Sequence, residues 1–204
     1  TIIPINSSNE QIRLAKTINE NATWALEPYV SVDRGAEIGM NHSSISEDES
    51  EGTHRFVLNT DVKRHVVDYS ENYIDTNEVD SGDLKNLDIY TETPKILIRY
   101  INSNIIAARD NEGYVSTNGI YHVQCEEYLD YLCGYLPSEL LSFWYRHSFQ
   151  STEVKFPKVQ MSHIDALPVV IPHTSGQNDT VNQRIDSGAL PVDKMDDEAV
   201  TVAD

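Results

Sequence analysis

The chain has 204 residues, of which 39% are hydrophobic, and this is enough for one ordinary folded core with appendages. It contains no run of about 18 apolar residues and no signal peptide, so we expect a cytoplasmic protein without a membrane partner. Taken as a whole, its net charge of −18 argues against a nucleic-acid-binding protein. Because the sequence does not begin with Met, we expect a fragment of a longer protein.

The first half of the chain predicts one helix and several short β-rich segments. A capping box formed by Ser7 and Glu10, followed by apolar residues at helical spacing, predicts a helix over about 8–21. After it we expect a bent strand or loop over 30–45, an acidic loop over 46–52, β-rich runs within 54–69 and a polar surface connection over 75–93.

The segment 94–123 predicts three short strands joined by turns, together forming a meander, with cations inside the apolar runs. Alternation places Ile96, Ile98 and Tyr100 on one face of the sheet, and the other face carries Lys95, Leu97, Arg99 and Ile101. These cations either keep that face solvated or contact a negatively charged partner.

The last part of the chain predicts helices, a short strand and a tail. Leucines at helical spacing predict a helix over 126–136, and Pro137 ends it before a second helix that carries Leu140, Leu141 and Trp144 in the core. A short helix over 162–167, a strand over 168–172 and an acidic linker or tail over 173–204 follow. The pattern indicates an α+β fold, a twisted antiparallel or mixed sheet with a few packed helices.

The acidic residues are unevenly distributed along the chain. Residues 1–93 carry 7 Lys and Arg against 18 Asp and Glu, whereas residues 94–172 carry 6 against 8 and are nearly neutral. Residues 173–204 carry 2 against 7. The charge that argues against nucleic acid therefore lies mainly outside the predicted strands. Diffuse acidity is also typical of proteins adapted to high salt.

The sequence contains no motif of a known catalytic centre. Its seven histidines form no H-E-x-x-H pair, no C-x-x-C is present, and the phosphate-binding, dinucleotide-binding and G-x-S-x-G motifs are absent. The segment Asp83-Leu84-Lys85 faintly matches a metal-nuclease arrangement, but it lies in a polar loop-like stretch. We therefore predict no metal site, no cofactor and no catalysis in this chain.

The order of five segments resembles the target recognition domain of restriction-modification N6-adenine DNA methyltransferases, in particular the TaqI-like C-terminal specificity domain and the similar domains of type I specificity subunits. Those segments are DRGAEIGMN, DVKRHVVDYSENYI, PKILIRYINSNIIAARDNEGYVSTNGIYHV, YLCGYLPSELLSFWYR and FPKVQMSHIDALPVVIP. An R-G-x-x-T-G-x-N element opens the family's domain, and residues 34–41 match it with Ile38 in place of Thr. Pro137-Ser138 stands where the family usually has Asn-Ser.

The resemblance implies an α+β, target-recognition-domain-like fold that reads double-stranded DNA for a methyltransferase domain of the same chain or complex. Residues 1–27 would form a lead-in with a helix, 28–172 the target recognition domain and 173–204 the linker or tail. S-adenosylmethionine and catalysis would belong to the methyltransferase domain, which is absent from this chain; whether the parent also cleaves DNA stays open.

The candidate site residues are side chains suited to phosphates or to base edges. For phosphates we predict Arg34, Lys63, Arg64, Arg99, Lys155 and Lys158, and for base edges Asn41, Asn118 and Gln160. Arg99 is the strongest candidate because it lies within an apolar strand; a salt bridge to an acid such as Glu112 is the alternative. Tyr114 and Tyr121 either stack on DNA or pack in the core.

Two other classes of function compete with a DNA reader. An acidic DNA mimic or other protein-interaction domain would explain the net charge directly, but it should carry acid over its whole surface, and residues 94–172 are nearly neutral. A small hydrolase or nuclease is disfavoured because no coherent catalytic set is present.

Overall fold

The structure is a computed structural model that describes residues 8–22, 24–26, 30–149 and 157–169. Its helices are α1 (Asn9–Glu20), α2 (Asp88–Thr91), α3 (Leu129–Tyr135), α4 (Glu139–Phe149) and α5 (Met161–Asp165), with a 3-10 helix η1 (Thr76–Glu78). Its strands are β1 (Trp24–Ala25), β2 (Ser31–Arg34), β3 (Ile45–Ser46), β4 (Thr53–Val57), β5 (Val62–Lys63), β6 (Val66–Val67), β7 (Asn72–Asp75), β8 (Lys95–Arg99), β9 (Ala107–Asp110), β10 (Val115–Ser116), β11 (Ile120–Gln124) and β12 (Pro168–Val169). The predicted α+β class is confirmed.

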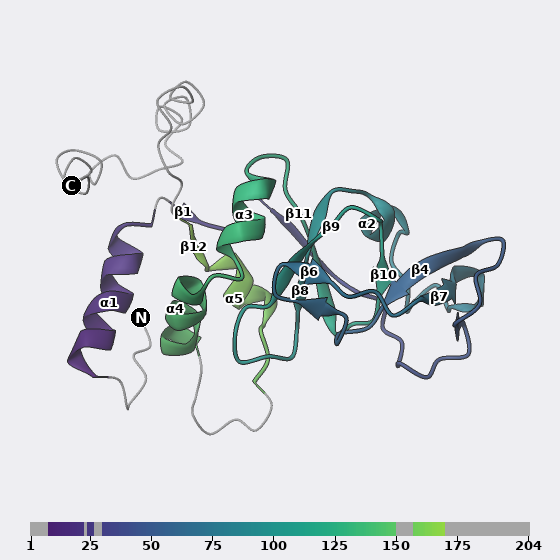
Figure 1. The fold of residues 1–204 in the computed structure, drawn as a ribbon, viewed down its shortest axis with the longest axis horizontal. Helices are drawn as coiled ribbons and strands as arrows, with labels where there is room; N and C mark the ends of the chain where they lie inside the picture. Colours follow the sequence, from purple (N-terminus) through teal and green to yellow (C-terminus); the bar gives the residue numbers. More distant parts are fainter. Residues whose placement is uncertain (1–7, 23, 27–29, 150–156, 170–204) are drawn as a thin grey trace.

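Two four-stranded sheets organise the molecule. The central sheet has the order β2-β11-β8-β9 and is antiparallel throughout. The outer sheet has the order β10-β4-β7-β3. Its β10–β4 pair is parallel and its other pairs are antiparallel, so this sheet is mixed, whereas the central sheet is purely antiparallel. In Figure 1 the helices α1, α3, α4 and α5 gather at one end of an elongated molecule and β4 and β7 lie at the other.

The predicted meander over 94–123 is wrong in its topology. β9 and β11 pair with opposite edges of β8, and between them the chain leaves the central sheet to form β10 in the outer sheet. Gly35 makes room for this crossing, because a Cβ on it would lie 2.1 Å from the carbonyl oxygen of Thr117. The excursion through β10 ties the two sheets together.

The main core lies between one face of the central sheet and the helices. Ile96 and Ile98 face this core, whereas Leu97 faces a second core beneath β5, as the predicted alternation requires. Leu141 and Trp144 are buried as predicted, but the prediction that Leu140 lies in the core is wrong, since its exposed fraction is 47%. The reason is that α4 turns only one side toward the sheet.

Two further predictions about local structure need correction. The capping box of α1 is formed by Ser8 and Gln11, one residue later than predicted: the N–H of Ser8 donates to Gln11 Oε1 at 2.8 Å, and that of Gln11 to Ser8 Oγ at 3.3 Å. The stretch 75–93 is more than a polar connection, because η1 and α2 lie in it and Tyr90 is fully buried against the outer sheet.

The described residues include no helix with the length and hydropathy that a membrane span requires. The predicted strand over 168–172 is present as β12, which pairs with β1, but residues 170–172 and the predicted tail over 173–204 lie outside the described part of the chain.

Candidate nucleic-acid interface

Two strands of the central sheet carry an arginine at the same end of the sheet, on its opposite faces. Arg34, the last residue of β2, lies opposite Tyr121, and Arg99, the last residue of β8, lies opposite Ile120. Both partners are at the start of β11, and the N–H of Arg99 donates to the carbonyl of Ile106 at 3.0 Å, immediately before β9. Antiparallel pairing therefore brings these cations to the same end of the sheet.

Tyr100 binds two of the predicted phosphate-contacting cations. The guanidinium carbon of Arg34 lies 4.4 Å from the centroid of its ring, and Nζ of Lys158 lies 5.3 Å from the same centroid. Lys158 reaches this position because it forms an antiparallel bridge with Ile101, and the N–H of Val159 donates to the Tyr100 carbonyl at 2.8 Å. Cation–π contacts of this kind hold a cation at the surface without neutralising it.

Arg34 is further anchored by the loop that precedes β11. Its Nε donates to the carbonyl oxygen of Asn118 at 2.8 Å, and its terminal nitrogen lies 3.6 Å from Oε1 of Glu37. The side-chain amide of Asn118 donates to the other oxygen of Glu37 at 2.6 Å. Asn118, a predicted base-reading residue, is thus adjacent to Arg34, and one of its amide donors is held by an internal carboxylate.

Arg99 carries an uncommitted guanidinium. Its side chain is half-buried, and within the described residues it makes no ion pair, while its buried Nε has no hydrogen-bond partner. The predicted alternative, a salt bridge to Glu112, is wrong, because Glu112 pairs with Arg55 at 2.6 Å. The charge of Arg99 therefore has no internal counter-ion in the described structure, and an anion at its terminal nitrogens would stabilise it.

The hairpin of β5 and β6 brings two more cations to the same end of the sheet. Its turn residue His65 donates its N–H to the carbonyl of Ala107 at 2.9 Å, at the first residue of β9. Arg64 forms an ion pair with Glu139, whereas Lys63 is exposed and has no ion pair among the described residues.

Arg146 of α4 is a sixth cation at this end, and it is not among the site residues predicted from the sequence. Its guanidinium donates to Oδ1 of Asn104, in the loop that joins β8 to β9. In the sequence, Arg146 is a basic residue within a predicted helix, and residues 102–104 are an Asn-Ser-Asn turn. Only the packing of α4 in the structure shows that the two are in contact. We call the set of cations at this end of the central sheet the cationic end, and its members are Arg34, Lys63, Arg64, Arg99, Arg146 and Lys158.

The remaining predicted site residues are less closely tied to the cationic end. Gln160 is exposed and lies two residues after Lys158, immediately before α5. Asn41 is exposed in the turn between β2 and β3, and none of its hydrogen bonds in the described structure reaches the cationic end. Lys155 lies outside the described residues. Tyr114 and Tyr121 are both buried, which favours the core over DNA stacking.

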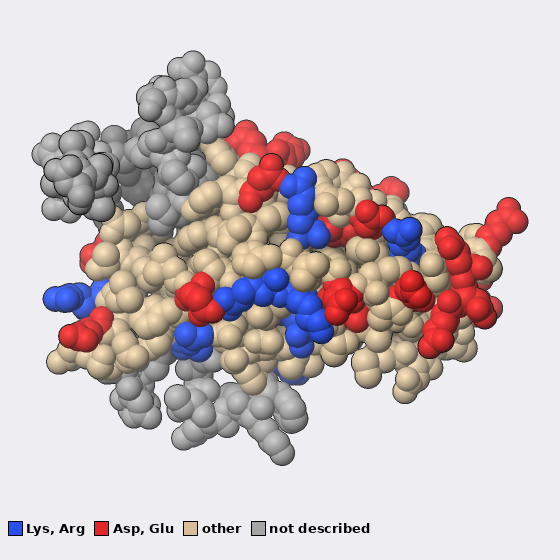
Figure 2. Space-filling view, viewed as in Figure 1, with Lys and Arg blue, Asp and Glu red and all other residues tan. Residues whose placement is uncertain are grey.

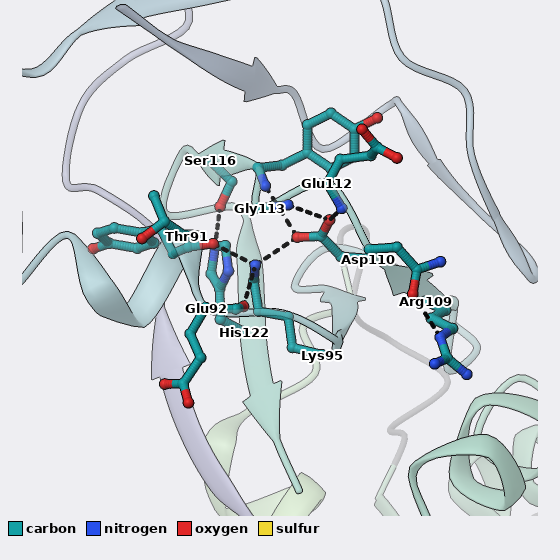
Figure 3. Close-up of polar contacts among 12 residues, drawn as sticks. Thr91, Glu92, Lys95, Arg109, Asp110, Glu112, Gly113, Ser116 and His122 are labelled. Atoms are coloured by element: carbon teal, nitrogen blue, oxygen red, sulfur yellow. Dashed lines mark hydrogen bonds and ion pairs between the residues drawn. The ribbon is translucent and has the colours of Figure 1, made fainter. Parts of the chain in front are cut away.

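The opposite end of the central sheet holds a buried ion pair rather than a solvated cation (Figure 3). Lys95 is fully buried, contrary to the solvated face we considered for it, and its Nζ lies 2.6 Å from Oδ2 of the equally buried Asp110. Nζ also donates to the carbonyls of Tyr90 and, at 3.1 Å, Glu92. Burial lowers the pKa of the Lys95 amine, and the Asp110 carboxylate opposes that shift.

Next to this pair, His122 is buried and joins the two sheets. One ring nitrogen, Nε2, lies 2.7 Å from the hydroxyl of Ser116, while Nδ1 has no partner in the described structure. Burial is the largest cause that holds the pKa of His122 well below its ordinary value, with Lys95 and Lys85 adding to it. His122 is therefore neutral at pH 7, and its contact with Ser116 links β11 of the central sheet to β10 of the outer sheet. Within the described ranges, no group of three or more His, Cys, Asp or Glu side chains could hold a metal ion.

Positive and negative side chains are unevenly distributed over the surface of the molecule. Figure 2 shows Lys and Arg side chains in a band across the middle of the molecule, over β6 and β8. Asp and Glu are scattered over the whole of this face and are densest at the end that holds β4 and β7, where the exposed acidic loop between β3 and β4 lies. A polyanion approaching this face would therefore be attracted to the middle and repelled by the outer sheet.

One protein-family model and two solved structures are similar to this chain. The family model of the TaqI-like C-terminal specificity domain matches residues 57–169. A chain from a structure on complex assembly and conformational transition of the type I R-M system aligns at a TM-score of 0.47 and 12% identity, covering 88% of this chain and 44% of that one. The HsdS subunit from Thermoanaerobacter tengcongensis aligns at a TM-score of 0.40 and 12% identity, covering 90% and 46%. This chain thus spans less than half the length of either structure, and the curated proteins contain no match.

Proposed function

The chain belongs to the TaqI-like C-terminal specificity domain family, and from this premise we propose that it reads a short sequence of double-stranded DNA for a restriction-modification methyltransferase. The observation that carries the proposal is the cationic end, where five separate parts of the chain supply six cations in an otherwise acidic protein. Cations of this kind bind phosphates and provide affinity, while neighbouring polar side chains provide sequence preference.

The cationic end offers two kinds of contact to DNA. Lys63, Lys158 and the uncommitted guanidinium of Arg99 are suited to phosphate oxygens. Asn118 and Gln160 lie beside these cations and have amide groups that can pair with the donor and acceptor edges of adenine. The contacts to phosphate would fix the position of the duplex, and the amides would then select among sequences.

Catalysis would be supplied by another domain, of the same chain or of the same complex. The methyltransferase domain would bind S-adenosylmethionine and transfer its methyl group to adenine N6, and this chain would choose the site. The chain's own contribution is then binding, orientation and selection, which requires no metal ion or cofactor at the cationic end.

The competing proposal, an acidic DNA mimic, fits the distribution of charge less well. A mimic presents carboxylates on the surface that its partner binds, whereas here the acidic side chains are densest over the outer sheet and cations lie across the middle of the molecule (Figure 2).

The proposal can be tested in the reconstituted methyltransferase, by which we mean the enzyme, of one chain or several, to which this chain contributes. Residues 57–169 are replaced by the matching segment of a family member that serves a different DNA site, and methylated positions are mapped by sequencing. We expect the methylated sequence to follow the transplanted segment. An active chimera that still methylates the original sequence would contradict the proposal.

A further inference from the structure

Two of the arginines at the cationic end are occupied by carboxylates of the same chain. Arg34 faces Glu37, whose side chain is 52% exposed, and Arg64 faces Glu139, whose side chain is 75% exposed. The other cations at this end make no ion pair with a carboxylate in the described structure. These carboxylates are therefore placed on the surface where DNA phosphates would have to bind.

The position of Glu37 is fixed by the residues around it. Asn118 donates its side-chain amide to Glu37 Oε2 at 2.6 Å, while Oε1 faces the terminal nitrogen of Arg34 at 3.6 Å. This second distance is too long for a strong hydrogen bond, so the attraction between Glu37 and Arg34 is mainly Coulombic. Glu37 is thus held beside Arg34 by Asn118 rather than by Arg34 itself.

Arg34 has only one part of its guanidinium left for a ligand. Its flat face covers the ring of Tyr100, and its Nε is committed to the carbonyl of Asn118. A phosphate must therefore bind at the terminal nitrogens, and one of these is the atom that faces Glu37. A phosphate that uses both terminal nitrogens therefore meets the Glu37 carboxylate at one of them.

We propose that Glu37 is an internal competitor of DNA phosphates, an inference that rests on the proposed function. In the free protein its carboxylate screens Arg34 and engages Asn118; on binding, a phosphate must displace it, or approach against its charge. Non-specific duplexes bind through phosphates alone, so this competition lowers their affinity directly. Duplexes of every sequence meet the same competition, so Glu37 weakens phosphate binding and leaves the choice of sequence to the base contacts.

The test uses Glu37→Gln in the reconstituted methyltransferase, since Gln keeps an oxygen that can accept from Asn118 and removes only the charge. Glu112→Gln is the matched control, because it makes the same change of charge at an exposed ion pair with Arg55 in the outer sheet. Fluorescence anisotropy gives the Kd for a non-cognate duplex over a series of salt concentrations. We expect Glu37→Gln to bind about two- to five-fold more tightly, the range of one exposed ion pair. The slope of log Kd against log salt should steepen by about 0.9, for one added phosphate contact.

The same measurement with Arg34→Ala separates the possible failures. In that background Glu37→Gln should gain less than it does beside Arg34, because only the repulsion by its charge is then left to remove. The inference is overturned if Glu37→Gln leaves the Kd unchanged, weakens binding, or gains no more than Glu112→Gln. It is also overturned if Glu37→Gln changes which sequence is methylated, since Glu37 would then read a base. If neither Arg34→Ala nor Arg99→Ala weakens the binding of the enzyme to DNA, the proposed function itself fails.

Discussion

The buried pair of Lys95 and Asp110 permits a quantitative prediction about stability. Replacing Lys95 with Met keeps most of the side-chain volume and removes the cation. Asp110 is then left in the core without a counter-charge, and the carbonyls of Tyr90 and Glu92 lose the donor that Nζ supplies. Figure 3 shows Glu92, just after α2, close to Lys95 of β8 and Asp110 of β9.

The expected loss follows from what remains around Asp110. Removing one partner of a buried ion pair typically costs about 3–5 kcal/mol of unfolding free energy. The backbone N–H groups of Glu112, Gly113 and Tyr114 still donate to the Asp110 carboxylate, at 2.9, 2.9 and 3.1 Å, and they stabilise its charge. We therefore expect Lys95→Met to cost about 3 kcal/mol, the lower part of that range.

Urea denaturation followed by circular dichroism measures this loss, and a second variant tests its cause. Lys95→Met combined with Asp110→Asn should be more stable than Lys95→Met alone, because no charge is then left buried without a partner. Arg55→Met, which breaks an exposed pair with Glu112, should cost less than about 1 kcal/mol. A loss below about 1 kcal/mol for Lys95→Met would refute the reasoning that the pair is buried and mutually dependent.

Three other predictions concern the crossing of the sheets, a buried histidine and the cation-binding ring. Gly35→Ala should destabilise the protein by more than about 2 kcal/mol in the same urea assay, because its Cβ would overlap the Thr117 carbonyl. Below about pH 6.5, His122 binds a proton in the unfolded chain but stays neutral in the folded protein. The unfolding free energy should therefore fall by up to about 1.4 kcal/mol for each unit of decreasing pH in this range, and His122→Gln should remove this part of the pH dependence. Tyr100→Leu should weaken DNA binding in an anisotropy titration by about two- to ten-fold, because Arg34 and Lys158 lose the ring that positions them, and unchanged affinity would count against this role.

The sequence predicted the fold well where one local rule decides the structure. Alternation correctly placed Ile96 and Ile98 on the core face of β8, and helical spacing correctly predicted α1, α3 and α4. Prediction from the sequence failed where contacts between distant segments of the chain decide the structure. The strand pairing in 94–123 depends on β10 joining β4, which is more than 50 residues earlier in the chain, and no short-range pattern carries that information.

The residues of the candidate site could likewise be predicted only in part from the sequence. Arg34, Arg99 and Lys158 could be named from residue type and the family resemblance, and the structure brings them to one end of the sheet. Lys95 and Arg99 lie four residues apart on the same strand, and alternation could not distinguish the buried cation from the uncommitted one. That difference depends on Asp110, which β9 places opposite Lys95, while β9 offers Arg99 no carboxylate.

The most direct test of the central claim compares two arginines in one titration. Arg99 lies at the cationic end and Arg55 in the outer sheet, and the same Arg→Ala change is made at each in the reconstituted methyltransferase. We predict that Arg99→Ala weakens binding to cognate DNA and lowers the slope of log Kd against log salt by about 0.9, while Arg55→Ala leaves both unchanged. Equal effects of the two changes, or an unaltered Kd and slope for Arg99→Ala, would contradict the assignment of the cationic end as the DNA-binding surface.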